Sequence, residues 1–137
     1  MMTSLPIDAT TVPSLTLVMD RALADILSQL QELRFHADSE STGDVCASEY
    51  AFDTGVRVLR DAAAACARAG RSIPRGRAST DDEGGIQVQW IRTSAGVNFV
   101  VPGVDSRPGY IYHEVGDTYG TCPPTADNLS RWLSEID

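Results

Sequence analysis

The stretch "GIQVQWIRTSAGVNFVV", Gly85–Val101, decides the fold because apolar and polar residues alternate in it twice. Apolar side chains fall at every second position of both runs: Ile86, Val88 and Trp90, then Val97, Phe99 and Val101. A period of two is typical of strands with one buried face, and the "TSAG" between the runs predicts a hairpin loop ending in glycine. We therefore expect these side chains to face helices, because a slip by one residue would bury Gln87 and Gln89 instead.

A third strand is predicted at Tyr110–Val115, "YIYHEV", after a longer turn that contains glycine and proline. Sequential strands joined by short loops favour an antiparallel meander, here of three strands over residues 86–116. The face turned away from the helices is then expected to mix polar and apolar side chains: Gln87, Gln89, Ile91, Asn98, Val100, Ile111, His113 and Val115. Such a mixture is typical of a protein–protein interface, in which apolar centres lie within a polar rim.

Two amphipathic helices are predicted before the strands. The first is expected at about Ser14–Arg34 and the second at about Ala47–Ala69, where Gly70 suits a left-handed C-terminal residue. A polar loop, His36–Asp44, joins them, so residues 14–70 are expected to form an antiparallel αα-hairpin. The apolar seam of this hairpin is expected to contain Met19, Leu23, Ile26, Leu30, Phe52, Val56 and Leu59.

A composition break, "RSIPRGRASTDDEGG" at residues 71–85, follows the helices and is predicted to be a linker. A C-terminal helix is expected at residues 123–136, where two prolines precede an apolar stripe of Leu129, Trp132, Leu133 and Ile136. Residues 1–13 are expected to form a flexible arm. The whole chain is therefore predicted to be a single α+β domain of two layers, in which the helices cover one face of the sheet.

The segment Asp81-Asp82-Glu83-Gly84-Gly85 suggests either a calcium loop or a turn that leads into the strand. An EF-hand loop with its glycine at Gly84 would require a bidentate Glu at the position of Trp90. The turn is the favoured interpretation, with hydrated carboxylates and glycines that supply a positive-φ backbone. A third interpretation, an acidic loop that binds a partner, makes Asp81, Asp82 and Glu83 candidate binding residues.

The charge of the chain points to a class of partner. The formal net charge of the 137 residues is −8, and the eleven basic residues are all arginines. An acidic surface repels nucleic acid and anionic membranes and attracts basic partners. Arginines gather at Arg68, Arg71, Arg75 and Arg77, which fits a helix C-terminus stabilised by cations; an anion-binding patch is the alternative.

Cysteine usage and hydropathy bear on the compartment. The three cysteines, Cys46, Cys66 and Cys122, are far apart and form no C-x-x-C pair, so neither a disulfide framework nor a zinc knuckle is predicted. Reduced thiols favour a cytoplasmic protein. The N-terminus lacks a cationic segment followed by an apolar run, and no apolar run approaches the roughly 20 residues of a membrane span.

No motif of a familiar catalytic class is present: the sequence has no G-x-S-x-G, H-E-x-x-H or Walker loop, and we predict no catalytic residue, metal or cofactor. Adjacent His113 and Glu114 would point to opposite faces of a strand. A Cys–His nucleophile pair is conceivable in space, but packing is the better explanation of Cys66 and Cys122. The alternative to a binding protein is a small enzyme or metal-binding protein with a site assembled from His36, Asp38 and His113.

Six segments follow one another in the last part of the chain: "DAAAACARAG", "SIPRGRA", "DDEGGIQVQW", "VNFVV", "YIYHEV" and "PPTADNLSRWL". They correspond to an Ala-rich helix, a linker with proline, an acidic turn with glycine, a strand that ends in Trp, two further strands and a C-terminal helix. In this order, residues 61–137 resemble a loose group of short, uncharacterised bacterial proteins. The resemblance implies a fold and a bacterial source, and it carries over no activity, cofactor or catalytic residue.

The sequence thus predicts a non-enzymatic acidic protein-binding module of the antitoxin, immunity or inhibitor type, acting on a basic protein partner in the bacterial cytoplasm. No nucleic-acid or membrane partner is expected, and the sequence also allows a homodimer. The candidate partner-binding residues are Asp81, Asp82, Glu83, Gln87, Gln89, Val100 and His113.

Overall fold

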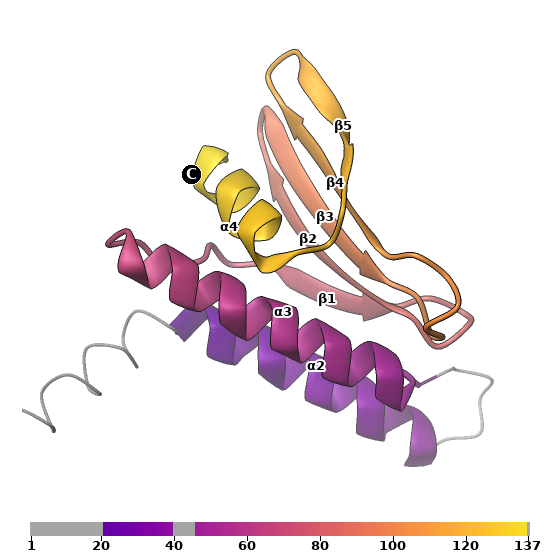
Figure 1. Cartoon of the computed structure of the whole chain (residues 1–137). Coiled ribbons are helices and arrows are strands. Elements are labelled where there is room, and N and C mark those ends of the chain that lie inside the picture. Colours follow the sequence, from indigo (N-terminus) through magenta and orange to yellow (C-terminus); the bar gives the residue numbers. More distant parts are fainter. Residues whose placement is uncertain (1–20, 40–45, 137) are drawn as a thin grey trace, which may run out of the picture.

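The computed structural model describes residues 21–39 and 46–136, except for the side chains of residues 35–39. A layer of helices lies against one face of a sheet (Figure 1). The elements, in chain order, are α2 (Arg21–Ser39), α3 (Glu49–Arg68), β1 (Arg77–Thr80), β2 (Ile86–Arg92), β3 (Ala95–Val101), β4 (Tyr110–Val115), β5 (Thr118–Cys122) and α4 (Ala126–Glu135). This architecture confirms the predicted α+β class.

The sheet has five strands in the order β1-β2-β3-β4-β5, and every neighbouring pair is antiparallel. The predicted meander of three strands is therefore present but incomplete, because one further strand pairs at each edge. β1 lies within the segment expected to be a linker, and β5 follows a turn after β4. Their sequences, "RAST" and "TYGTC", lack apolar alternation, so only backbone pairing with β2 and β4 reveals them as strands.

The residues of β2 and β3 that were predicted to face the core do so. Ile86, Val88, Trp90, Val97, Phe99 and Val101 are each 3% exposed or less. Trp90 is fully buried, and its indole Nε1 donates a hydrogen bond to the carbonyl oxygen of Pro74 at 2.9 Å. Gly76 lies flat against the same indole, since a Cβ there would come within 2.7 Å of Trp90 Nε1.

Helices α2 and α3 lie side by side and run in opposite directions (Figure 1). α2 continues to Ser39, so the backbone of His36 and Asp38 is helical and the prediction of a loop from His36 is wrong. No glycine or proline stands between Leu33 and Ser39, and polarity alone does not end a helix. The expected start of this helix at Ser14, its seam residue Met19 and the arm at residues 1–13 lie outside the described residues.

The buried face of α3 is turned slightly from the predicted seam. Leu59 is fully buried as expected, whereas Phe52 and Val56 are half-buried at the margin of the core. Small residues let the helix approach the sheet closely, and a Cβ on Gly55 would lie 2.3 Å from Ile86 Cδ1. The buried residues of α3 are Ala51, Gly55, Val58, Leu59, Ala62, Ala63 and Cys66.

α2 also covers the β1 edge of the sheet. Gln29 Nε2 donates to the carbonyl oxygen of Gly76 at 3.1 Å, and Gln29 Oε1 accepts from the backbone N–H of Ala78 at 2.8 Å. One amide side chain thus takes the place that a further strand would occupy, which protects this edge from pairing with another chain.

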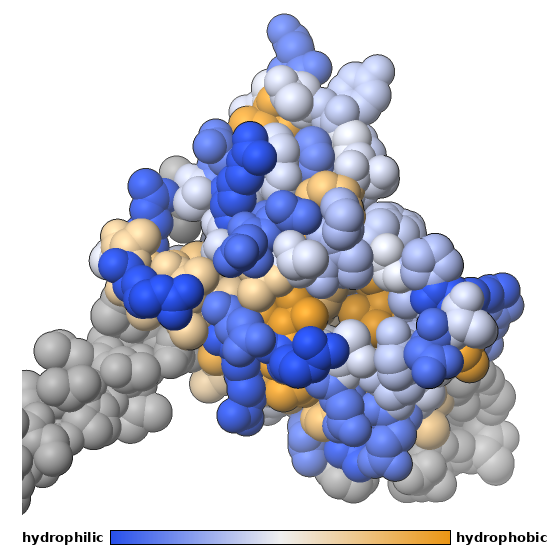
Figure 2. All heavy atoms as spheres, viewed as in Figure 1, coloured by the Kyte–Doolittle hydropathy of each residue, from blue (hydrophilic) through white to orange (hydrophobic). Residues whose placement is uncertain are grey.

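α4 packs on α3 and on β3 and β4, where Leu129 and Leu133 are buried. In the view of Figure 2, which is that of Figure 1, hydrophobic residues reach the surface mainly in the middle of the molecule, and hydrophilic residues surround them. Among the described residues, no helix combines the length and the apolar character that crossing a bilayer would need.

Candidate functional site

One face of the sheet is left without a described helix. Cross-strand pairing sets its side chains in three rows, because directly paired residues point to the same side. The rows are Gln87–Val100–Tyr110, then Gln89–Asn98–Tyr112–Thr121, then Ile91–Gly96–Glu114–Tyr119. β1 adds Arg77 beside Gln89 and Ser79 beside Gln87. We call this surface the open face.

The open face contains Gln87, Gln89 and Val100 as the sequence predicted, but the phase of β4 is the reverse of the expected one. Ile111 pairs with Phe99 and His113 pairs with Val97, so both point toward the helices and are buried. Tyr110, Tyr112 and Glu114 take their places on the open face. The pattern "YIYHEV" is largely apolar at both phases, so only its register with β3 decides which side is buried.

Exposed aromatic and apolar side chains concentrate on the open face. Ile91 is 72% exposed, Tyr119 73%, Tyr110 41% and Tyr112 36%, and these are four of the six large hydrophobic residues that are exposed in residues 21–39 and 46–136. The strand positions of this face include one cation, Arg77, and one anion, Glu114. In a chain of net charge −8, this face is therefore nearly neutral and rich in tyrosine.

A hollow of about 550 Å³ opens on this face near the β2–β3 hairpin. Gly96 forms part of its wall between Ile91 on β2 and Glu114 on β4, its direct neighbours in the row. Tyr112 Oη donates to Glu114 Oε1 across 3.4 Å. Burial first, and then Glu114 and Tyr119, raise the pKa of Tyr112 above its ordinary value, so its hydroxyl keeps its proton at neutral pH.

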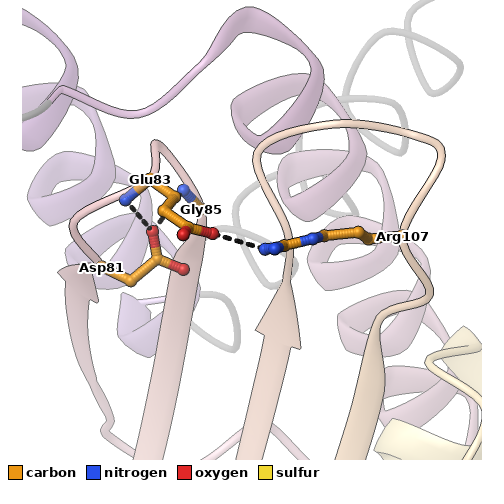
Figure 3. A network of polar contacts seen from close by, with 4 residues as sticks. All are labelled: Asp81, Glu83, Gly85 and Arg107. Carbon is orange, nitrogen blue, oxygen red and sulfur yellow. Dashed lines mark hydrogen bonds and ion pairs between the residues drawn. The ribbon is translucent and has the colours of Figure 1, made fainter.

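The acidic turn lies at the other end of the strands, between β1 and β2. Asp81 Oδ1 accepts hydrogen bonds from the backbone N–H groups of Glu83 and Gly85, both at 2.8 Å (Figure 3). Glu83 forms an ion pair with Arg107 of the β3–β4 loop, and Gly84 has φ +86°. The turn is confirmed, but only Gly84 of its two glycines has a positive φ, Asp81 is a structural acceptor and Glu83 is ion-paired, so these two carboxylates are not merely hydrated.

The same turn is anchored to the start of α3. The backbone N–H of Ser48 donates to Gly84 O at 2.8 Å, and its hydroxyl donates to Gly103 O at 2.7 Å. That hydroxyl also accepts from the N–H of Ala51, which makes Ser48 the N-cap of α3. Asp82 and Glu83 are thereby held at the margin of the open face, beyond Gln87, and the hollow lies at the opposite margin.

His113 does not reach the open face. Its ring is 8% exposed and stacks on Trp132 of α4 with centroids 3.7 Å apart and planes 7° from parallel. Its Nδ1 is buried without a hydrogen-bond partner. Burial, and secondly the charge of Arg131, lower the pKa of His113. The side chain is a neutral core group, and it belongs to the helix-covered face.

Cys122 stands one cross-strand row from His113 on the covered face, but the two are not tuned as a nucleophile and its base. Burial raises the pKa of the Cys122 thiol, although a hydrogen bond from Trp132 and the charge of Arg131 act in the opposite direction. A reactive pair needs a stabilised thiolate beside an imidazolium. Here both groups are shifted toward their neutral forms, which favours a packing role.

The alternative site of His36, Asp38 and His113 falls partly outside the described side chains. The side chains of His36 and Asp38 are not described, and their backbone belongs to the last turns of α2. Within the described residues, no three His, Cys, Asp or Glu side chains come together as metal ligands.

The structure adds Tyr110, Tyr112, Tyr119, Gly96 and Glu114 to the sequence-predicted candidates. One signal could have found two of them, because tyrosines two apart in a strand, as in "YIY", share a face. A scan of family models and searches of curated proteins and of solved structures found no match to this chain.

Proposed function

We propose that the protein is a non-enzymatic binding module that holds a basic protein partner against the open face of its sheet. The observation that carries this proposal is the composition of that face: exposed tyrosines and Ile91 among amides, with two charged residues. Enrichment in tyrosine and depletion of charge are the features that separate interface cores from ordinary surface.

The charge of the chain supports the basic partner. A net charge of −8 attracts a cationic protein from a distance and raises the association rate, whereas the nearly neutral open face supplies the contacts that slow dissociation. Antitoxins, immunity proteins and inhibitors act in this way, by covering a functional surface of their target. Cys66 and Cys122 are free thiols, which supports the proposed cytoplasmic location, and the arginine- and alanine-rich composition supports a bacterial source.

Capture and binding kinetics test the proposal. The immobilised chain is used to isolate a basic protein, which is then purified and measured in a surface-binding assay. Val100→Asp places a charge on the central strand of the open face and is expected to raise the dissociation rate by about tenfold or more, equivalent to about 1.4 kcal/mol. Ala64→Asp makes the same charge change on the exposed side of α3 and is the matched control. Weaker binding by the Ala64 variant alone would assign the interface to the helices and contradict the proposal.

Asp82 tests the steering role of the acidic turn separately. Asp81 is needed by the turn itself and Glu83 is paired, so Asp82→Asn is the cleanest removal of charge. We expect slower association at low salt and an unchanged dissociation rate. If the variant associates as fast as the wild type, the acidic turn does not steer the partner, and the open face alone determines binding.

A further inference from the structure

The hollow on the open face is lined in part by Gly96, a strand residue without a side chain. Gly96 lies between Ile91 and Glu114 in a cross-strand row, and strands are spaced about 4.8 Å apart, so its two neighbours flank a gap of about 10 Å. The backbone does not require glycine there. Its φ lies outside the left-handed region, and a Cβ would meet only Trp90 O, at 3.4 Å.

Glycine within a strand usually weakens the sheet, and Gly96 is the second residue of β3. Since a larger residue fits the backbone of position 96, the space above Gly96 is the feature that glycine provides. That space belongs to the hollow of about 550 Å³ on the open face. The hollow offers space for a side chain of a bound partner.

The walls of the hollow favour a cation. Glu114 and Tyr112 both line the hollow, and the Tyr112 hydroxyl donates a hydrogen bond to the Glu114 carboxylate. The amide oxygen of Asn98 accepts no hydrogen bond. Arg92 also lines the hollow, but its guanidinium is engaged by the carbonyl oxygens of Ile91 and Arg75, to which it donates.

We infer that this hollow receives an arginine side chain of the basic partner, a step that rests on the proposed function. The guanidinium forms a bidentate pair with Glu114 and lies on a tyrosine ring, while its aliphatic stem runs over Gly96 beside Ile91. A planar fork of donors matches a carboxylate and stacks on aromatic rings, whereas the compact ammonium of lysine does neither as well. The pocket thus makes the interface selective for one residue type.

The test uses the whole chain labelled with ¹⁵N and titrated with Nα-acetyl-arginine amide, followed by amide chemical shifts. Saturable shifts are expected at Gly96, Asn98, Tyr112 and Glu114. Nα-acetyl-citrulline amide, which has the same shape without the charge, is expected to produce none, and Nα-acetyl-lysine amide to produce smaller ones. Gly96→Val fills the hollow and Glu114→Gln removes its charge, so each is expected to abolish the response. Thr121→Val, at an exposed position of the same face, is the matched control and is expected to retain it.

Equal responses to the arginine and citrulline probes, or a response that survives Gly96→Val, would overturn the inference. No saturable response in the folded wild-type chain would overturn it too. The proposed function is judged by a different measurement, because Val100→Asp lies outside the residues that line the hollow and affects capture of the partner. If Val100→Asp abolishes binding of the partner and Gly96→Val does not affect it, the proposed binding function stands and the arginine pocket is rejected.

Discussion

The two faces of the sheet are built from alternate residues of the same strands, yet they differ in every property that bears on their roles. Across the middle of the sheet, the covered face presents Val88, Phe99 and Ile111, all fully buried. At the adjacent position of each strand, the open face presents Gln89, Asn98 and Tyr112, which are half-buried or exposed. The comparison teaches that the pleat alone separates the residues that hold the fold together from those of the face proposed to bind a partner. Substitutions on the two faces should therefore have opposite profiles.

The largest loss of stability is expected from Trp90→Ala on the covered face. Removing a fully buried indole leaves a cavity and an unpaired Pro74 carbonyl, so the free energy of unfolding should fall by about 3–5 kcal/mol. Urea denaturation followed by circular dichroism measures this change. A loss under about 1 kcal/mol would show that the covered face does not hold the fold together.

A smaller loss is expected from Asp81→Ala in the turn between β1 and β2. The substitution removes the acceptor for two backbone N–H groups, which should cost about 1–2 kcal/mol. Asp82→Ala is the matched control and should change the free energy of unfolding by less than about 0.5 kcal/mol. Equal effects of the two substitutions would mean that the turn is held by its glycines and by Ser48 alone.

His113 should make stability depend on pH. Its pKa is lowered in the folded state, so the unfolded chain binds the proton more tightly. The free energy of unfolding should be constant, as far as this group is concerned, above its ordinary pKa of about 6.5, and should fall as the pH drops below that value. Denaturation of the wild type and of His113→Gln at several pH values checks this, because the variant should lose that part of the dependence. Identical pH profiles would contradict it.

The smallest effect on stability is expected from Tyr112→Ser on the open face. The side chain is 36% exposed and contacts no helix residue through a hydrogen bond, so the free energy of unfolding should change by less than about 0.5 kcal/mol, while binding of the partner should weaken. Parallel urea titrations and binding measurements test both parts. A variant that is much less stable than the wild type but binds the partner normally would contradict the assignment of different roles to the two faces.

Local patterns in the sequence were sufficient for part of this molecule. They placed α3, the strands around Trp90 and Phe99, and the buried side of both strands, because helical and strand periodicities depend on neighbours within a few residues. They also identified the turn before β2, and Gln87, Gln89 and Val100 as residues of the helix-free face. The net charge that favours a basic partner is likewise a property of the sequence.

Contacts between distant segments decided the rest. β1 and β5 are strands because β2 and β4 pair with them, and the phase of β4 follows from the alignment of Ile111 with Phe99. The hollow requires Gly96 to come between Ile91 and Glu114, which lie on separate strands. Register is a non-local property that no single strand encodes when both of its phases are apolar, so the tertiary structure alone buried His113 and exposed Tyr112.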